Sequence, residues 1–80
     1  MTKFTSKEVG ILLHHGYSRI ADDEFRNVHI DGDYETIVKD SEDEFSYYYD
    51  VADYKDDIDR ANGGHTEYDL TWEDLIELYL

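Results

Sequence analysis

The stretch from Asp40 to Asp59, DSEDEFSYYYDVADYKDDID, constrains the fold more than any other part of this 80-residue chain. It holds nine carboxylates against one cation, Lys55, and four tyrosines lie among them. Like charges repel, so a run of this density is typically disordered unless the same segment also contributes apolar surface to a core. The interleaved tyrosines supply that surface. We therefore expect the stretch to form part of a small folded domain with an acidic face.

The charge of the whole chain favours a single acidic domain, residues 1–80. The formal net charge is −14, and it is unevenly placed: residues 1–20 carry three cations and one acid, residues 21–80 carry 20 acids and four cations. Nucleic acid and anionic membranes repel such a surface, so we expect neither as a direct partner. A domain of this size has little surplus stability, and a homodimer formed through a tyrosine-bearing face would add to it.

Several classes of function find no support in the sequence. There is no cysteine, no apolar run of membrane-spanning length and no apolar signal segment at the N-terminus, which fits a cytoplasmic protein. The sequence contains no phosphate-binding glycine loop and no nucleophile motif, and its four histidines lack the spacing of metal ligands. We expect a non-enzymatic protein that needs no cofactor.

The N-terminal region predicts a helix over residues 6–15. Thr5 and Glu8 have the spacing of a capping box, and Gly16 is placed to end the helix in the left-handed conformation. Residues 17–21 alternate weakly between polar and apolar side chains, which suggests a short strand.

The central region predicts three antiparallel strands. Asp31-Gly32 separates two β-rich runs and favours a type I′ turn between strands over residues 25–31 and 33–39. Residues 45–50 predict the third strand. Alternation along it places Phe45, Tyr47 and Tyr49 on one face and Ser46 and Tyr48 on the other.

Two short helices are expected after these strands. Asp50 can cap the first, and its apolar stripe consists of Val51, Tyr54, Ile58 and Ala61. Residues 65–70 then form a connector or a short edge strand. Thr71 can cap the second helix, with Asp74 in the capping-box position. The apolar stripe of this helix consists of Trp72, Leu75, Ile76 and Tyr79. The predicted architecture is therefore α+β: an N-terminal helix, a three-stranded antiparallel sheet, and two C-terminal helices that cover one face.

Oxygen-bearing side chains around residue 31 raise a calcium alternative. Asp31, Asp33, Glu35 and Glu42 occupy ligand positions of an EF-hand loop. The position that requires glycine for the sharp turn holds Thr36, however, and the flanking runs resemble strands rather than helices. An acidic hairpin explains the pattern better.

Partner binding is the role that the carboxylates fit best. On a strand, carboxylates two residues apart are about 7 Å from each other, and on a helix those four apart are about 6 Å from each other. Both approximate the phosphate spacing of a nucleic-acid strand. Tyrosines, Tyr48 and Tyr34 among them, would add desolvated contacts that charge alone does not provide. The candidate partner-binding residues are Asp22, Asp23, Glu24, Asp31, Asp33, Glu35, Glu42, Asp43, Glu44, Tyr48, Asp53, Asp56, Asp57 and Asp59.

Size, net charge, the absence of cysteine and the 40–59 stretch together resemble those of the small acidic DNA-mimic inhibitors of phages and mobile elements. Anti-CRISPR, anti-restriction and uracil-DNA glycosylase inhibitor proteins belong to this class. The resemblance implies a stoichiometric inhibitor that mimics nucleic-acid charge and blocks the groove of a basic nucleic-acid-binding protein, such as a CRISPR effector, a restriction enzyme or a repair enzyme. The alternative is an immunity or antitoxin protein that neutralises a basic nuclease toxin.

Overall fold

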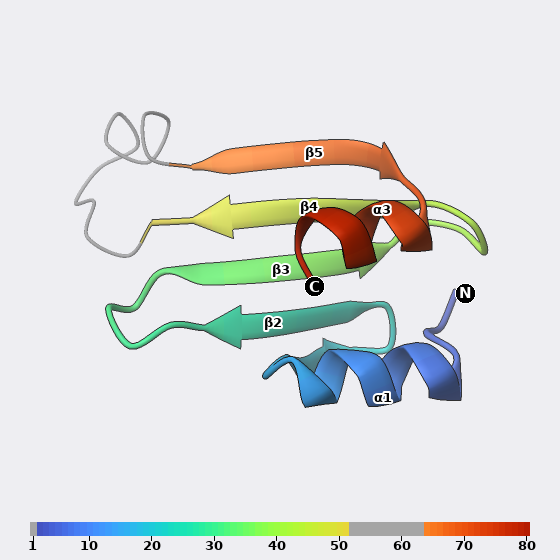
Figure 1. Ribbon diagram of the computed structural model, residues 1–80, viewed down its shortest axis with the longest axis horizontal. Coiled ribbons are helices and arrows are strands. Elements are labelled where there is room, and N and C mark those ends of the chain that lie inside the picture. Colours follow the sequence, from blue (N-terminus) through green and yellow to red (C-terminus); the bar gives the residue numbers. More distant parts are fainter. Residues whose placement is uncertain (1, 52–63) are drawn as a thin grey trace.

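The computed structural model describes residues 2–51 and 64–80, which form two helices on one face of a five-stranded antiparallel sheet (Figure 1). The strands are β1 (Ser18–Ala21), β2 (Glu24–Val28), β3 (Tyr34–Lys39), β4 (Phe45–Asp50) and β5 (His65–Leu70), and they lie side by side in chain order. The helices are α1 (Ser6–His14) and α3 (Trp72–Leu78). The α+β class is as predicted, but the three-stranded sheet is wrong.

The two additional strands are the edge strands of the sheet. All four residues of β1 are exposed, and its pairing with β2 shifts register between Arg19 and Ala21. β5 pairs with β4 and is exposed at four of its six positions. A short strand over residues 17–21 and an edge strand over residues 65–70 were among the expectations, but the predicted three-stranded sheet included neither. Because both strands expose most of their residues, they lack the buried apolar face that marks a strand as part of a core-forming sheet.

The turn between β2 and β3 also differs from the prediction. His29 N donates to Asp33 O at 2.7 Å, and Gly32 N donates to His29 O at 2.9 Å, which makes a three-residue loop. Gly32 has a φ of +95°, whereas Asp31 has no positive φ. A type I′ turn needs positive φ at both central residues, so the geometry is a type I turn followed by a left-handed glycine. The strands are consequently shorter than the predicted 25–31 and 33–39.

Both helices begin as predicted, each with a capping box. Thr5 and Glu8 exchange side-chain to backbone hydrogen bonds at the start of α1, and Thr71 and Asp74 do so at the start of α3. Each pair satisfies two of the backbone N–H groups that a helix start leaves without partners. Gly16, with a φ of +89°, follows α1.

The placement of the helices on the sheet corrects the prediction. The helix expected after Asp50 falls mainly on residues 52–63, which lie outside the described residues. Leu12 of α1 and Leu75 of α3 are both fully buried in one core, so the N-terminal helix and α3 cover the same face. The core consists of Phe4, Leu12, Tyr17, Phe25, Ile37, Phe45, Tyr47, Leu70 and Leu75.

Candidate functional site

Three acidic segments meet at one end of the sheet. In an antiparallel sheet with strands in chain order, alternate connections lie at the same end. The β1–β2 turn, the β3–β4 loop and the junction of β5 with α3 therefore gather on one side (Figure 1). We call residues 22–24, 40–44 and 69–74 the acidic end. These segments contain three, four and three carboxylates, ten in all, and no lysine or arginine.

The loop 40–44 presents its tip to solvent because its base is closed by hydrogen bonds. Asp40 N donates to Glu44 O at 2.9 Å, and the Ser46 hydroxyl donates to the Asp40 carboxylate at 2.5 Å. Ser41 Oγ donates to Glu44 Oε1 at 3.2 Å. Glu42 and Asp43, at the tip, are exposed and form no hydrogen bond or ion pair with any described residue. The loop therefore holds two carboxylates outward that its own structure does not use.

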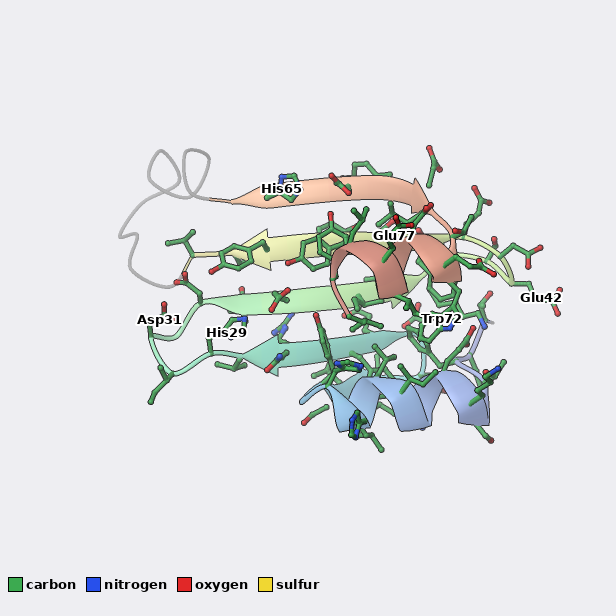
Figure 2. All side chains as sticks on the ribbon, viewed as in Figure 1. His29, Asp31, Glu42, His65, Trp72 and Glu77 are labelled. Atoms are coloured by element: carbon green, nitrogen blue, oxygen red, sulfur yellow. The ribbon has the colours of Figure 1, made fainter. Side chains whose placement is uncertain are left out.

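A hollow of about 380 Å³ lies between this loop and the start of α3. We call it the aromatic hollow. Trp72 is half-buried in it, and its ring packs on that of Phe45 with centroids 5.5 Å apart. Figure 2 shows Trp72 and Glu42 at the same end of the molecule. The residues that line the hollow are Glu8, Glu42, Asp43, Phe45, Thr71, Trp72 and Glu73.

One cation lies inside the protein near the acidic end, and it is already paired. Lys39 is only 3% exposed, and its Nζ atom donates to Glu8 Oε1 at 2.8 Å. The same nitrogen lies 5.9 Å from the ring centroid of Phe4 and 5.6 Å from that of Phe45. Glu8 and Lys39 neutralise each other, so they leave the negative charge of the ten carboxylates in place. Lys3, beside Glu42 in a neighbouring hollow, offsets one charge at most.

The opposite end of the sheet uses its carboxylates differently. Glu35 accepts hydrogen bonds from the Tyr47 hydroxyl at 2.6 Å and from His29 Nε2 at 2.5 Å. Asp33 accepts from the Tyr49 hydroxyl at 2.8 Å, and the His29 ring stacks on that of Tyr49. We call these five residues the tyrosine end. Asp33 and Glu35 were predicted to contact a partner, but here both are bound by side chains of the protein itself.

Tyrosines at and beside the tyrosine end have raised phenol pKa values. Burial raises the pKa of Tyr47 well above its ordinary value, and its hydrogen bond to Glu35 raises it further. Burial raises the pKa of Tyr17 as well, with a smaller contribution from the charge of Glu35. Beside them, Tyr79 stacks on Tyr47 with ring centroids 3.6 Å apart and donates to Glu67. Burial and that hydrogen bond raise the pKa of Tyr79 to about 12.

The helix-free face of the sheet is a third region. It carries Tyr48 beside Tyr68, with ring centroids 6.1 Å apart in an edge-to-face arrangement. Arg26 lies there over the ring of Tyr34 at 4.5 Å and donates to Thr36. A shallow hollow of about 240 Å³ on this face is lined by Glu24, Arg26, Thr36, Val38, Tyr48 and Asp50. The predicted alternation along β4 is confirmed, since Phe45 and Tyr47 face the core and Tyr48 does not.

The predicted binding residues thus fall into separate groups. Six are at the acidic end: Asp22, Asp23, Glu24, Glu42, Asp43 and Glu44. Asp31, Asp33 and Glu35 are at the opposite end, where Figure 2 shows Asp31 beside His29. Tyr48 is on the helix-free face. Asp53, Asp56, Asp57 and Asp59 lie outside the described residues.

The residues considered as calcium ligands in the sequence do not lie together in the structure. Strand β3 separates Asp31 and Asp33 from Glu42, and Figure 2 places Asp31 and Glu42 at opposite ends of the sheet. Six strand residues span about 20 Å, whereas calcium ligands lie within about 2.6 Å of the ion. Within residues 2–51 and 64–80, no three His, Asp or Glu side chains are grouped as metal ligands.

Sequence reasoning missed Trp72, Glu73, Asp69 and Asp74 as members of the site. Trp72 was predicted only as part of the apolar stripe of a helix, and Asp74 only as its capping-box residue. Their proximity to the 40–44 loop follows from the pairing of Phe45 with Leu70, which joins β4 to β5. These residues would have been located from the sequence if residues 65–70 had been identified as a strand of the same sheet.

The chain has no match among protein-family models, curated proteins or solved structures. Nor does any helix in the described ranges have the length and apolar character that crossing a membrane requires. The chemistry of the acidic end and its hollow therefore provides the main guide to function.

Proposed function

We propose that this protein is a non-enzymatic inhibitor that binds a basic nucleic-acid-binding protein and occupies its nucleic-acid groove. A CRISPR effector, a restriction enzyme or a repair enzyme is the class of target that we favour. The observation that carries the proposal is the acidic end, where ten carboxylates from three connections meet without a lysine or arginine among them.

The charge density of this end is comparable to that of DNA. The segments run from the start of β2 to the end of β5, which is three strand spacings, or about 14 Å. Duplex DNA carries one charge per about 1.7 Å of axis, so ten charges correspond to about 17 Å of duplex. A lysine- and arginine-lined groove would therefore meet a similar number of negative charges over a similar length.

Rigid placement of these charges supports the same proposal. The β1–β2 turn and the β3–β4 loop each join two paired strands, and Lys39 N donates to Asp23 O at 2.9 Å, which ties the first turn to β3. Carboxylates on a rigid frame lose little conformational entropy on binding. Complementary charge also accelerates association, and the rate falls as salt increases.

A capture experiment tests the proposal. The tagged protein is incubated with lysate of bacteria that express CRISPR effectors and restriction enzymes, the bound material is eluted with a salt gradient, and each eluted protein is purified. We expect a nucleic-acid-binding enzyme that is released by salt, is displaced by DNA and loses DNA binding when this protein is added in stoichiometric amount.

A matched variant makes the result specific. Replacing Glu42, Asp43 and Glu73 by Gln, Asn and Gln should weaken capture, while the helix content stays unchanged. A captured enzyme that DNA does not displace would contradict the groove-blocking mechanism. A captured nuclease toxin whose catalytic site is covered would instead establish the immunity or antitoxin alternative.

A further inference from the structure

We propose that the aromatic hollow is the receptor for one arginine side chain of the basic partner. This inference rests on the proposed function, since it names the contact by which the acidic end would recognise its target. The hollow combines a half-buried indole, Trp72, with the carboxylates of Glu42, Asp43 and Glu73. Charge complementarity and the contacts that the protein makes with its own Lys39 both favour a cationic occupant.

The wall of the hollow suits a cation on an aromatic ring. Trp72 and Phe45 form a continuous aromatic surface, with ring centroids 5.5 Å apart. A cation placed over an aromatic face within about 6 Å is attracted by the negative charge of the ring face, and tryptophan is the strongest such ring. Phe45 is almost fully buried, so Trp72 is the ring available to an incoming side chain.

The protein's own Lys39 shows this chemistry at Phe45, the ring on which Trp72 packs. Its ammonium lies over the rings of Phe4 and Phe45 and is neutralised by Glu8, which also lines the hollow. Phe45 thus has an internal cation nearby, whereas Trp72 has none among the cation–ring contacts of the described residues. Glu42, Asp43 and Glu73 are the carboxylates that would neutralise the corresponding external cation.

Arginine fits this hollow better than lysine. A guanidinium is planar, stacks on aromatic faces and donates two parallel hydrogen bonds to one carboxylate, whereas an ammonium is a compact, strongly hydrated charge. The volume of about 380 Å³ is roughly that of a dozen water molecules, which leaves room for one long side chain with bridging water. The three carboxylates lie on two different segments, 40–44 and 69–74, so they can approach the cation from separate directions.

The fluorescence of Trp72, the single tryptophan of the chain, tests the inference directly. Tetra-arginine and tetra-lysine peptides of equal charge are titrated into the intact protein at fixed low salt. We expect a saturable change in Trp72 fluorescence with tetra-arginine, and weaker binding of tetra-lysine. Trp72→Leu, checked for folding by circular dichroism, should reduce the preference for arginine when binding is measured by calorimetry.

Two charge-matched variants locate the site. The triple variant Glu42→Gln, Asp43→Asn, Glu73→Gln removes the carboxylates of the hollow. The control Asp31→Asn, Asp50→Asn, Glu77→Gln removes three charges outside the acidic end and the hollow, so that both proteins have a formal net charge of −11, three less negative than −14. We expect the hollow variant to bind tetra-arginine about tenfold more weakly, and the control variant to lose about twofold or less.

Equal losses in the two variants would overturn the hollow as a receptor, because binding would then depend on the total charge. That result would leave the proposed function standing. A Trp72 signal that does not saturate would overturn the inference as well. Specific arginine binding in the hollow, combined with failure to capture any nucleic-acid-binding protein, would instead contradict the proposed function.

Discussion

The two ends of the sheet contain the same kinds of side chain and use them in opposite ways. At the tyrosine end, Glu35 and Asp33 accept hydrogen bonds from Tyr47, His29 and Tyr49. Their negative charges are therefore stabilised by donors of the protein itself. At the acidic end, Glu42 and Asp43 have no such donor among the described residues. A carboxylate with an internal donor stabilises the fold, whereas one that is held outward without a donor is suited to an external cation.

The aromatic rings also differ in whether their contacts are all internal. Tyr47 and Tyr79 stack on each other, and their hydroxyls donate to Glu35 and Glu67 respectively. One face and the hydroxyl of each ring are therefore already in contact with the protein itself. Trp72 packs on Phe45 and also borders a hollow. The difference indicates that dense acidic sequence alone does not define a binding surface. The position of each carboxylate relative to the protein's own donors decides its role.

The largest effect is expected at the buried ion pair of Glu8 and Lys39, which lies beside the acidic end. Lys39→Met should lower the free energy of unfolding by about 3 kcal/mol, because Glu8 would remain largely buried without its cation. Urea unfolding measures the change. Lys7→Met, at an exposed position of α1, is the control and should change stability by less than about 0.5 kcal/mol. Equal effects would show that Lys39 is not a structural cation.

The next effect tests the tyrosine end. Tyr47→Phe keeps the stacked ring but removes the hydroxyl that Glu35 accepts from, and should cost about 2 kcal/mol. In a domain of this size, that corresponds to a fall in melting temperature of about 10 °C. Tyr68→Phe, at a ring that is 64% exposed, should leave the melting temperature nearly unchanged. A harmless Tyr47→Phe would mean that Glu35 is satisfied without it.

Alkaline pH should weaken the packing of Tyr79, which stacks on Tyr47 beside the tyrosine end, by a smaller amount. The pKa of Tyr79 is raised from 10.0 to about 12 in the folded protein, so above pH 10 the unfolded chain loses its phenol protons first. The stabilisation is complete below pH 10 and should be lost as the pH rises toward 12. Urea midpoints across this range measure the loss. Tyr79→Phe should make the profile less steep, and the raised pKa values of Tyr17 and Tyr47 account for the slope that remains. An unchanged slope in that variant would contradict the assignment.

The smallest effect is expected for the outward carboxylates of the acidic end. Replacing Glu42, Asp43 and Glu73 by their amides should change the unfolding free energy by no more than about 0.5 kcal/mol. A slight gain at low salt is expected because repulsion among like charges falls, and added salt should remove that gain. Thermal unfolding at two salt concentrations measures both effects. A large loss would mean that these carboxylates support the fold.

Much of the fold could be predicted from local signals. Both capping boxes and the alternation of faces along β4 are short-range patterns, and the structure contains all three. The Asp31-Gly32 pair marked the hairpin correctly, but the turn type depends on a φ angle at Asp31 that residue identity does not fix. The short strands considered over residues 17–21 and 65–70 were left out of the predicted three-stranded sheet, because they expose most of their residues and lack the continuous apolar face of a central strand.

The candidate site depended on that missing information. Which acidic segments lie together is set by the number of strands between them, and a three-stranded sheet gives a different grouping from a five-stranded one. The 40–44 loop was recognised as acidic from its sequence. Residues 22–24 and 69–74 could be assigned to the same end as this loop only after β1 and β5 were known to belong to the sheet.

The most direct test of the account is to map where a cation-rich ligand binds. Amide chemical shifts of the isotope-labelled protein are recorded while tetra-arginine is added at physiological salt. We predict that the shifts of residues 22–24, 40–44 and 69–74 and of the Trp72 indole change, and that those of residues 29–35 do not. Changes centred on residues 29–35, or on Tyr34, Tyr48 and Tyr68 of the helix-free face, would contradict the assignment of the acidic end as the binding surface.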